Sequence, residues 1–156
     1  MHQTQLYLAP IQGITDYIFR NQVLKHFVGL NKVFAPFVRF QHGFEFKKSQ
    51  LTDIHPINNQ TEFFIPQILS KSSEEILYFA QYINDLGYKE LNWNLGCPFP
   101  MVTNKQLGSG MLPYPEIIDQ TLQDVFSKIE VKLSVKMRLG LISSSESIDF
   151  IKILNR

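Results

Sequence analysis

Short apolar runs alternate with longer segments of helical periodicity along the whole chain. The apolar runs predict buried strands near residues 6–9, 32–36, 62–68, 90–95 and 131–137. The segments between them place apolar side chains three and four positions apart, which predicts helices at residues 16–27, around 44–52, and after residues 72, 115 and 145. Strands that alternate with helices pair in parallel through right-handed crossovers, so the pattern predicts an α/β protein.

Residues at the helix ends support these boundaries. Thr15 is the expected N-cap of the first helix, and Ser72 with Glu75 forms the S-x-x-E pattern of a capping box. Gly87 occupies the position where a helix commonly ends in a left-handed conformation, and Pro115 suits the first position of the next helix. No linker composition interrupts the repeat.

The sequence allows two architectures for the predicted sheet. The near-continuous apolar strands fit a parallel sheet that is buried on both faces. Such a sheet is either open and doubly wound, or closed as a TIM (β/α)8 barrel, which needs eight units over about 250 residues. Because the chain has 156 residues and five predicted units, a barrel would make residues 1–156 its N-terminal part.

Composition excludes several classes of protein. Hydrophobic residues make up 44% and charged residues 19%, so the chain is globular rather than disordered. The formal charge of +1 gives no indication of a polyanionic partner, although a local basic patch can still bind RNA. A single cysteine excludes an internal disulfide and a multi-cysteine metal site, and the four histidines show no metal-ligand spacing, so we expect no metal.

The chain also lacks the signals that direct proteins to membranes or to secretion. Its start has no basic flank followed by a long apolar run, and no apolar run approaches the roughly 20 residues of a membrane span. We therefore expect a cytoplasmic protein.

The segment around the only cysteine is the best candidate for chemistry. Cys97 follows the predicted strand at 90–95, and Asn94, Gly96 and Pro98 suit a tight turn at its end. Active sites of repeating strand–helix proteins are built at this end of the strands. Cys97 is therefore either a reactive group or a small buried hydrophobe, which is the commoner role of a free cysteine.

A lysine interrupts the last predicted strand. If Lys136 is buried in a barrel it needs an anionic partner, because an unpaired buried charge is costly. Alternatively its long stem lets the ammonium reach the mouth of the barrel. Arg138, two residues later, has the same face parity.

Four separated segments resemble the tRNA-dihydrouridine synthases in order, spacing and position at strand ends. They are residues 8–16 with the following Phe19-Arg20, residues 66–68, residues 92–98 with the following 108–112, and residues 135–140. The resemblance covers nearly the whole chain. It implies a flavin-dependent TIM barrel that reduces uridine to 5,6-dihydrouridine in tRNA, with FMN as cofactor and NADPH or NADH as reductant. Family members continue through further barrel units and a helical RNA-binding domain, and neither is present in residues 1–156.

The resemblance also implies roles for substrate-binding and catalytic residues. Reduction of the C5–C6 bond needs a hydride at C6, which reduced flavin supplies, and a proton at C5. Cys97 matches the family's general acid, and a thiol with an ordinary pKa near ~8.5 is protonated at neutral pH. Asn94 matches the asparagine that contacts the uracil, although a turn asparagine that bonds its own backbone would look the same. Arg138 either meets RNA or caps its strand.

The expected flavin contacts come from three strands. The backbone of Pro10, Ile11 and Gln12 matches the segment that meets the edge of the flavin ring, although a strand-ending turn has the same composition. Gln67 matches the family's flavin-binding glutamine, whose amide suits the pyrimidine edge of the ring. Lys136 matches the lysine beside the N1–C2=O region, where a cation favours reduced flavin.

The chain departs from the family pattern in two places, and two rival functions remain open. Residues 136–140 run into Leu141-Ile142-Ser143, without the acidic residue often found just beyond. After Cys97 the chain reads Phe99-Pro100-Met101, where small and basic residues are more usual. Another FMN-dependent TIM-barrel oxidoreductase, such as a dihydroorotate-dehydrogenase-like enzyme, shares the fold, but the Gly-Cys-Pro sequence argues against it. A non-catalytic truncated remnant would keep the fold and bind neither flavin nor RNA.

Overall fold

The computed structural model describes residues 4–41 and 43–155, so residues 1–3, 42 and 156 lie outside the described part. In chain order the strands and helices are β1 (Leu6–Leu8), α1 (Tyr17–His26), β2 (Leu30–Phe34), α2 (Lys48–Ile54), β3 (Phe64–Ile65), β4 (Gln67–Ile68), α3 (Ser73–Asp85), β5 (Glu90–Leu95), α4 (Pro100–Thr103), α5 (Pro115–Phe126), β6 (Lys132–Met137) and α6 (Glu146–Leu154). Short 3₁₀ segments, η1 (Pro56–Asn58) and η2 (Gly108–Met111), lie between them. None of the helices in the described ranges is long and apolar enough to cross a membrane.

All strand pairs are parallel, and the strands lie in chain order. β1, β2 and β3 form one sheet, and β4, β5 and β6 form the other. Only Pro66 separates β3 from β4, and it has no N–H to donate to a ladder. A bridge between Val38 and Ile68 ties the end of the first sheet to the second. The predicted parallel α/β class is therefore confirmed.

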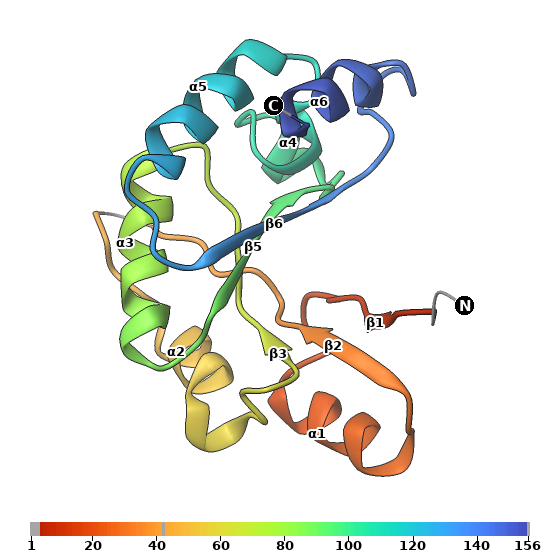
Figure 1. Cartoon of the computed structure of the whole chain (residues 1–156), viewed down its shortest axis with the longest axis vertical. Coiled ribbons are helices and arrows are strands. Elements are labelled where there is room, and N and C mark those ends of the chain that lie inside the picture. The colour runs from red at the N-terminus through yellow and green to blue at the C-terminus, as the bar shows by residue number, and fades with distance from the viewer. Residues whose placement is uncertain (1–3, 42, 156) are drawn as a thin grey trace.

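The order of the strands distinguishes the two predicted closures. A doubly wound sheet reverses its strand order at a switch point, whereas a barrel adds each new strand beside the previous one. The described strands show no reversal, and β1 and β6 each pair with one strand only, so they do not close into a barrel (Figure 1). The arrangement is that of an open, curved parallel sheet.

The two faces of β5 differ in character. Leu91, Trp93 and Leu95 are fully buried and belong to the main hydrophobic core, whereas Glu90, Asn92 and Asn94 alternate with them and face the other way. Helices α3 and α5 lie along the apolar side (Figure 1). They contribute the buried residues Ile76, Phe79, Ile83, Ile118, Leu122 and Val125.

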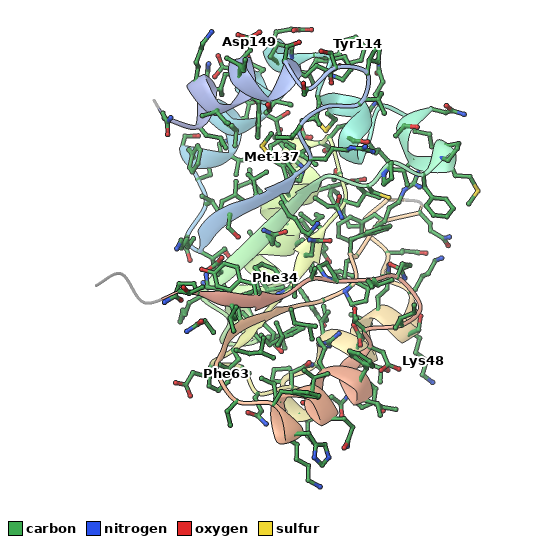
Figure 2. The ribbon with its side chains drawn as sticks, turned by 90° about the vertical axis from the view of Figure 1, so that its right-hand side faces the viewer. Phe34, Lys48, Phe63, Tyr114, Met137 and Asp149 are labelled. Carbon is green, nitrogen blue, oxygen red and sulfur yellow. The ribbon has the colours of Figure 1, made fainter. Side chains whose placement is uncertain are left out.

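The prediction of a sheet buried on both faces holds for β5 but is wrong for β6. All six residues of β5 are buried, and none of the six in β6 is fully buried. β6 is an edge strand that pairs with β5 alone among the described strands, and Figure 2 labels Met137 at its end. Of the two alternatives for Lys136, a buried or an accessible ammonium, the described chain shows an exposed side chain.

The capping signals around α3 are confirmed in part. The Ser72 hydroxyl accepts the backbone N–H of Glu75 at 3.2 Å, as the capping box predicts. The reciprocal bond is absent from the described residues, because the Ser72 N–H donates to the Ser70 hydroxyl and Glu75 also bonds that hydroxyl. Gly87 adopts φ +91°, so the predicted glycine stop is confirmed.

Three predicted boundaries are wrong. The helix expected around 44–52 begins at Lys48, and the strand expected at 62–68 breaks at Pro66. The segment after Cys97, expected as a loop, contains α4 and η2. These short elements carry no helical repeat long enough to detect in the sequence.

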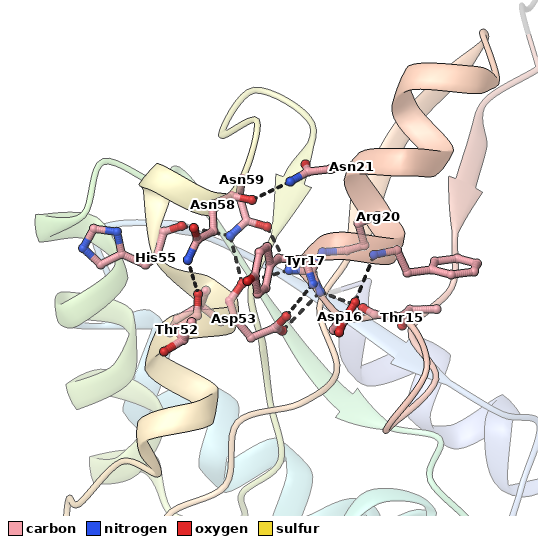
Figure 3. Close-up of polar contacts among 12 residues, drawn as sticks. Thr15, Asp16, Tyr17, Arg20, Asn21, Thr52, Asp53, His55, Asn58 and Asn59 are labelled. Atoms are coloured by element: carbon pink, nitrogen blue, oxygen red, sulfur yellow. Dashed lines mark hydrogen bonds and ion pairs between the residues drawn. The ribbon is translucent and has the colours of Figure 1, made fainter.

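A buried arginine joins α1 to α2 and η1 (Figure 3). Arg20 is 1% exposed, and its Nη1 donates to the Thr15 carbonyl at 2.7 Å and to Asp53 Oδ2 at 3.1 Å. Its Nη2 donates to the Asp53 carbonyl at 2.9 Å and to Asn59 Oδ1 at 2.8 Å. Burial lowers the pKa of Arg20 from its ordinary value, and the charge of Asp53 opposes that effect. We call these four residues the arginine clamp.

The arginine clamp also fixes the loop after β1. Asp16, not Thr15 as predicted, caps α1 by accepting the N–H of Phe19 at 2.9 Å. The Thr15 hydroxyl instead accepts the N–H of Ile11 at 2.8 Å, while the Thr15 carbonyl is held by Arg20. The loop is therefore anchored to the clamp through a single residue.

We expect Arg20→Met to destabilise the fold by about 3–5 kcal/mol, because it leaves the half-buried Asp53 carboxylate without its cation. The matched control is Lys152→Met, which removes an exposed i,i+3 pair with Asp149 and should cost about 0–1 kcal/mol. Urea unfolding measures both free energies. Equal effects of the two substitutions would contradict a stabilising clamp.

A second local network makes the stability of the fold depend on pH. The Glu146 carboxylate accepts the N–H groups of Leu141, Ile142 and Ser143 at 2.8–3.0 Å. Burial raises its pKa, but the three donors together outweigh that effect and hold the pKa below its ordinary value. Its contribution to stability is therefore present above the unfolded pKa near ~4.3 and is lost as the pH falls through the lower folded value. We expect the unfolding free energies of wild type and Glu146→Gln to converge as the pH is lowered from 7 to 3; a constant difference would exclude the linkage.

Candidate active site

Buried side-chain amides form a continuous chain across β4, β5 and β6. Asn94 Nδ2 donates to Gln67 Oε1 at 2.8 Å, and Gln67 Nε2 donates to Asn92 Oδ1 at 2.7 Å. Asn92 Nδ2 then donates to the Ser134 hydroxyl at 2.9 Å. The exposed fractions of Gln67, Asn92 and Asn94 are 0%, 2% and 8%. We call these four residues the amide chain.

Strand register builds the amide chain. Gln67 pairs with Asn92, and Asn92 pairs with Ser134, so the three side chains lie side by side on one face. A buried amide without a partner costs about 1–3 kcal/mol on mutational scales, which the mutual hydrogen bonds avoid. Asn92, to which the sequence alone assigned no role, is the central member. The sequence indicated this position only by its spacing: Asn92 lies two residues before Asn94 in the same strand and so shares its face.

The amide chain ends on the loop between β5 and α4, residues 96–99, which we call the cysteine loop. Asn94 Oδ1 accepts the N–H groups of Gly96 at 3.1 Å and Cys97 at 3.0 Å, which confirms the predicted turn. The Cys97 carbonyl in turn accepts the N–H of Ser109 at 3.1 Å and its hydroxyl at 2.9 Å. Hydrogen bonds therefore hold the backbone of Cys97 on both sides.

Close packing also restricts the cysteine loop. Gly108 adopts φ +56°, and a Cβ at this position would lie 2.9 Å from the Cys97 carbonyl oxygen and 3.0 Å from the Cys97 Cβ. Only glycine suits both the conformation and the space. Cys97 itself is partly buried and packs against a small apolar cluster formed by Leu69, Val102 and Leu107. The thiol therefore lies beside apolar groups.

A pocket of about 720 Å³ opens beside Cys97. Its lining comes from the segments after β1, β2 and β5 and from the start of α2, where the carboxyl ends of parallel strands meet. No acidic side chain among the described lining residues faces it. The lining residues are Gln12, Phe37, Arg39, Phe40, Gln41, Lys47, Gln50, Cys97, Phe99, Met101, Val102 and Lys105. The pocket brings together Gln12 and Cys97, two of the predicted site residues.

The segment after β1 offers fewer backbone groups than its sequence indicates. The Ile11 N–H donates to Thr15, and the Ile11 carbonyl accepts the N–H groups of Ile14 and Thr15, both at 3.1 Å. Pro10 has no N–H. The N–H of Gln12 is the backbone donor that remains in this segment, with no partner among the described residues.

The two cations of the last strand motif are brought near the amide chain. Lys136 pairs in register with Asn94, and Arg138 follows β6 with the same face parity. Both are exposed, and neither forms an ion pair within residues 4–41 and 43–155. Two of the four histidines, His2 and His42, lie outside the described residues, and no group of His, Cys, Asp and Glu in the described part could hold a metal ion.

Sequence comparisons identify related proteins. The model of the family "Dihydrouridine synthase (Dus)" matches residues 7–156. The chain is 29% identical over 140 residues to a tRNA-dihydrouridine synthase B of Pasteurella multocida (strain Pm70), covering 88% of this chain and 41% of the relative. It is 28% identical over 138 residues to a protein of the same name from Vibrio vulnificus (strain CMCP6), covering 88% and 42%.

A relative with a different name matches over a longer stretch. The tRNA-dihydrouridine(16) synthase of Neisseria meningitidis serogroup A is 26% identical over 154 residues, covering 94% of this chain and 46% of the relative. The chain thus spans less than half the length of these relatives. Since the family model covers nearly every residue, the chain belongs to the dihydrouridine synthase (Dus) family.

Proposed function

We propose that the protein to which this chain belongs reduces uridine to 5,6-dihydrouridine in tRNA, with FMN as cofactor and NADPH or NADH as reductant. The observation that carries the proposal is the cysteine loop: the amide chain holds Cys97 at the carboxyl end of β5, beside a pocket large enough for a nucleobase. Because the chain spans less than half of its relatives, the activity is assigned to the whole protein.

The residues on the polar face fit FMN by their chemistry. Gln67 uses one N–H and one lone pair within the amide chain, so one N–H and one lone pair remain that suit the donor and acceptor edge of the ring. The side chain is 0% exposed in the described structure, so contact with the ring requires it to be uncovered. The free N–H of Gln12 and the unpaired ammonium of Lys136 would add a donor and a cation, and Pro10 and Ile11 would add apolar surface next to Gln12. When bound, reduced FMN would supply the hydride that reaches C6 of the base.

The chain's own residues donate the proton and bind the base. The Cys97 thiol donates the proton to C5, opposite the face that receives the hydride. Asn94 orients the uracil with a single remaining N–H, because its Oδ1 already accepts two backbone N–H groups and its other N–H goes to Gln67. Arg138 contacts the RNA backbone near the pocket. Leu69, Val102 and Leu107 keep water away from one side of the thiol.

We expect Cys97→Ala in the whole protein to retain FMN and to lose about 10²- to 10⁴-fold in tRNA reduction, the usual loss of a general acid. The control is the rate of NADPH oxidation by the bound flavin, which does not use the thiol and should be unchanged. Mass spectrometry of the tRNA nucleosides measures dihydrouridine. Undiminished formation of dihydrouridine by the variant would remove Cys97 from the mechanism.

We expect Lys136→Met to weaken FMN binding and to lower the reduction potential of the flavin, because the cation that favours its reduced form is lost. The matched control is Lys132→Met on the same face of β6, where the lysine lies 3.9 Å from Glu90 instead of beside Asn94. Redox titration compares the two variants with wild type. A wild-type potential in Lys136→Met, or the same shift in both variants, would exclude the role.

A further inference from the structure

The pocket beside Cys97 has cations that the proposed chemistry does not use. Arg39, Lys47 and Lys105 line it, and none of them forms an ion pair with an acidic side chain in the described parts of the chain. Arg39 follows β2, Lys47 caps the start of α2, and Lys105 follows α4. In a chain of 15 basic and 14 acidic residues, three unpaired cations around one pocket form a local basic site. Such a site suits a ligand that carries several negative charges.

The same rim presents an aromatic ring to solvent. Phe99 is 63% exposed and lines the pocket two residues after Cys97. Pro98 and Pro100 flank it and restrict its backbone, and its carbonyl accepts the N–H groups of Val102 and Thr103 at 2.8 and 2.9 Å. The backbone of Phe99 is therefore held in place at the rim of the pocket. The half-buried Phe37 and the exposed Met101 also line the pocket and extend the apolar surface.

An exposed aromatic ring among unpaired cations is the chemistry that recognises single-stranded RNA. Bases that are not paired stack on aromatic side chains, while lysine and arginine contact the phosphates between them. An enzyme that acts on a base must also take it out of the stack, which leaves its neighbour without a stacking partner. Resting on the proposed function, we infer that Phe99 stacks on the nucleobase next to the uridine that is reduced, and that Arg39, Lys47 and Lys105 contact the phosphates flanking it.

The test compares two phenylalanines of similar exposure. Phe99→Ala removes the proposed stacking ring, Phe99→Tyr retains it, and Phe126→Ala removes a ring on α5 that is 59% exposed and does not line the pocket. The probe is an unmodified tRNA transcript, and its binding is measured by fluorescence anisotropy. Phe99→Ala should weaken binding roughly ten- to hundredfold and raise KM by a similar factor, while Phe99→Tyr and Phe126→Ala stay close to wild type. FMN content and melting temperature should not change in any of the three.

Two further measurements separate stacking from a loss of structure. A short RNA with 2-aminopurine beside a uridine should lose fluorescence on binding to wild type and to Phe99→Tyr, and should keep it with Phe99→Ala. Arg39→Gln and Lys105→Gln should each reduce the slope of log K against log salt by about 0.7–1, with quenching retained. Lys25→Gln on α1, outside the pocket, should leave the slope unchanged.

The outcomes distinguish the inference from the proposed function. Phe99-dependent quenching together with an absence of dihydrouridine formation in wild type would support the RNA contact and overturn the proposed activity. Normal dihydrouridine formation in Phe99→Ala, with unchanged KM and unchanged quenching, would overturn the contact and leave the activity standing. Equal losses in Phe99→Ala and Phe99→Tyr would show that the ring packs within the protein, and would also overturn the contact.

Discussion

The burial of side-chain amides on one face of β5 is the constraint on which the site depends. Asn92 and Asn94 lie in a strand whose residues are all buried, so each polar atom needs a partner from a neighbouring strand. Gln67 and Ser134 supply those partners only if β4, β5 and β6 keep their register. A slip by one residue would move the amides into the apolar core, which is strongly unfavourable. The hydrogen bonds that satisfy the strand interior therefore also place the loop of Cys97.

The arginine clamp acts in a similar way on the opposite side of the pocket. Arg20 bonds the Thr15 carbonyl, and the Thr15 hydroxyl bonds Ile11, so the segment that carries Gln12 is anchored to α1. The two networks have no residue in common, yet each ends on a segment that lines the same pocket. This division explains why the pocket needs residues that are distant in the chain. It also explains how Gln12 and Cys97 line the same pocket although no hydrogen bond joins them.

The sequence predicted those features that depend on neighbours along the chain. The alternation of strand and helix, the cap at Ser72 and the stop at Gly87 all follow from local preferences, and all are present. The sequence did not predict the features that depend on contacts between strands. The role of Asn92 requires knowledge of which strand lies beside it, and the exposure of Lys136 follows from the edge position of β6, which an apolar run of residues does not reveal. The cysteine turn was predicted because its partner Asn94 is only three residues away.

The pocket changes in character from the thiol to its rim, and this change fits the nucleotide ligand proposed above. Near Cys97 the side chains are apolar and buried, as a neutral base requires, whereas Lys47 and Lys105 are exposed, as contacts to phosphate in water require. In the proposed function, polar recognition of the base falls to the remaining N–H of Asn94, whose Oδ1 holds the loop of Cys97. A ligand without a charged backbone would leave the cations unpaired, and a ligand without a flat neutral part would leave the apolar wall in water. The pocket therefore suits the proposed ligand, which has both parts.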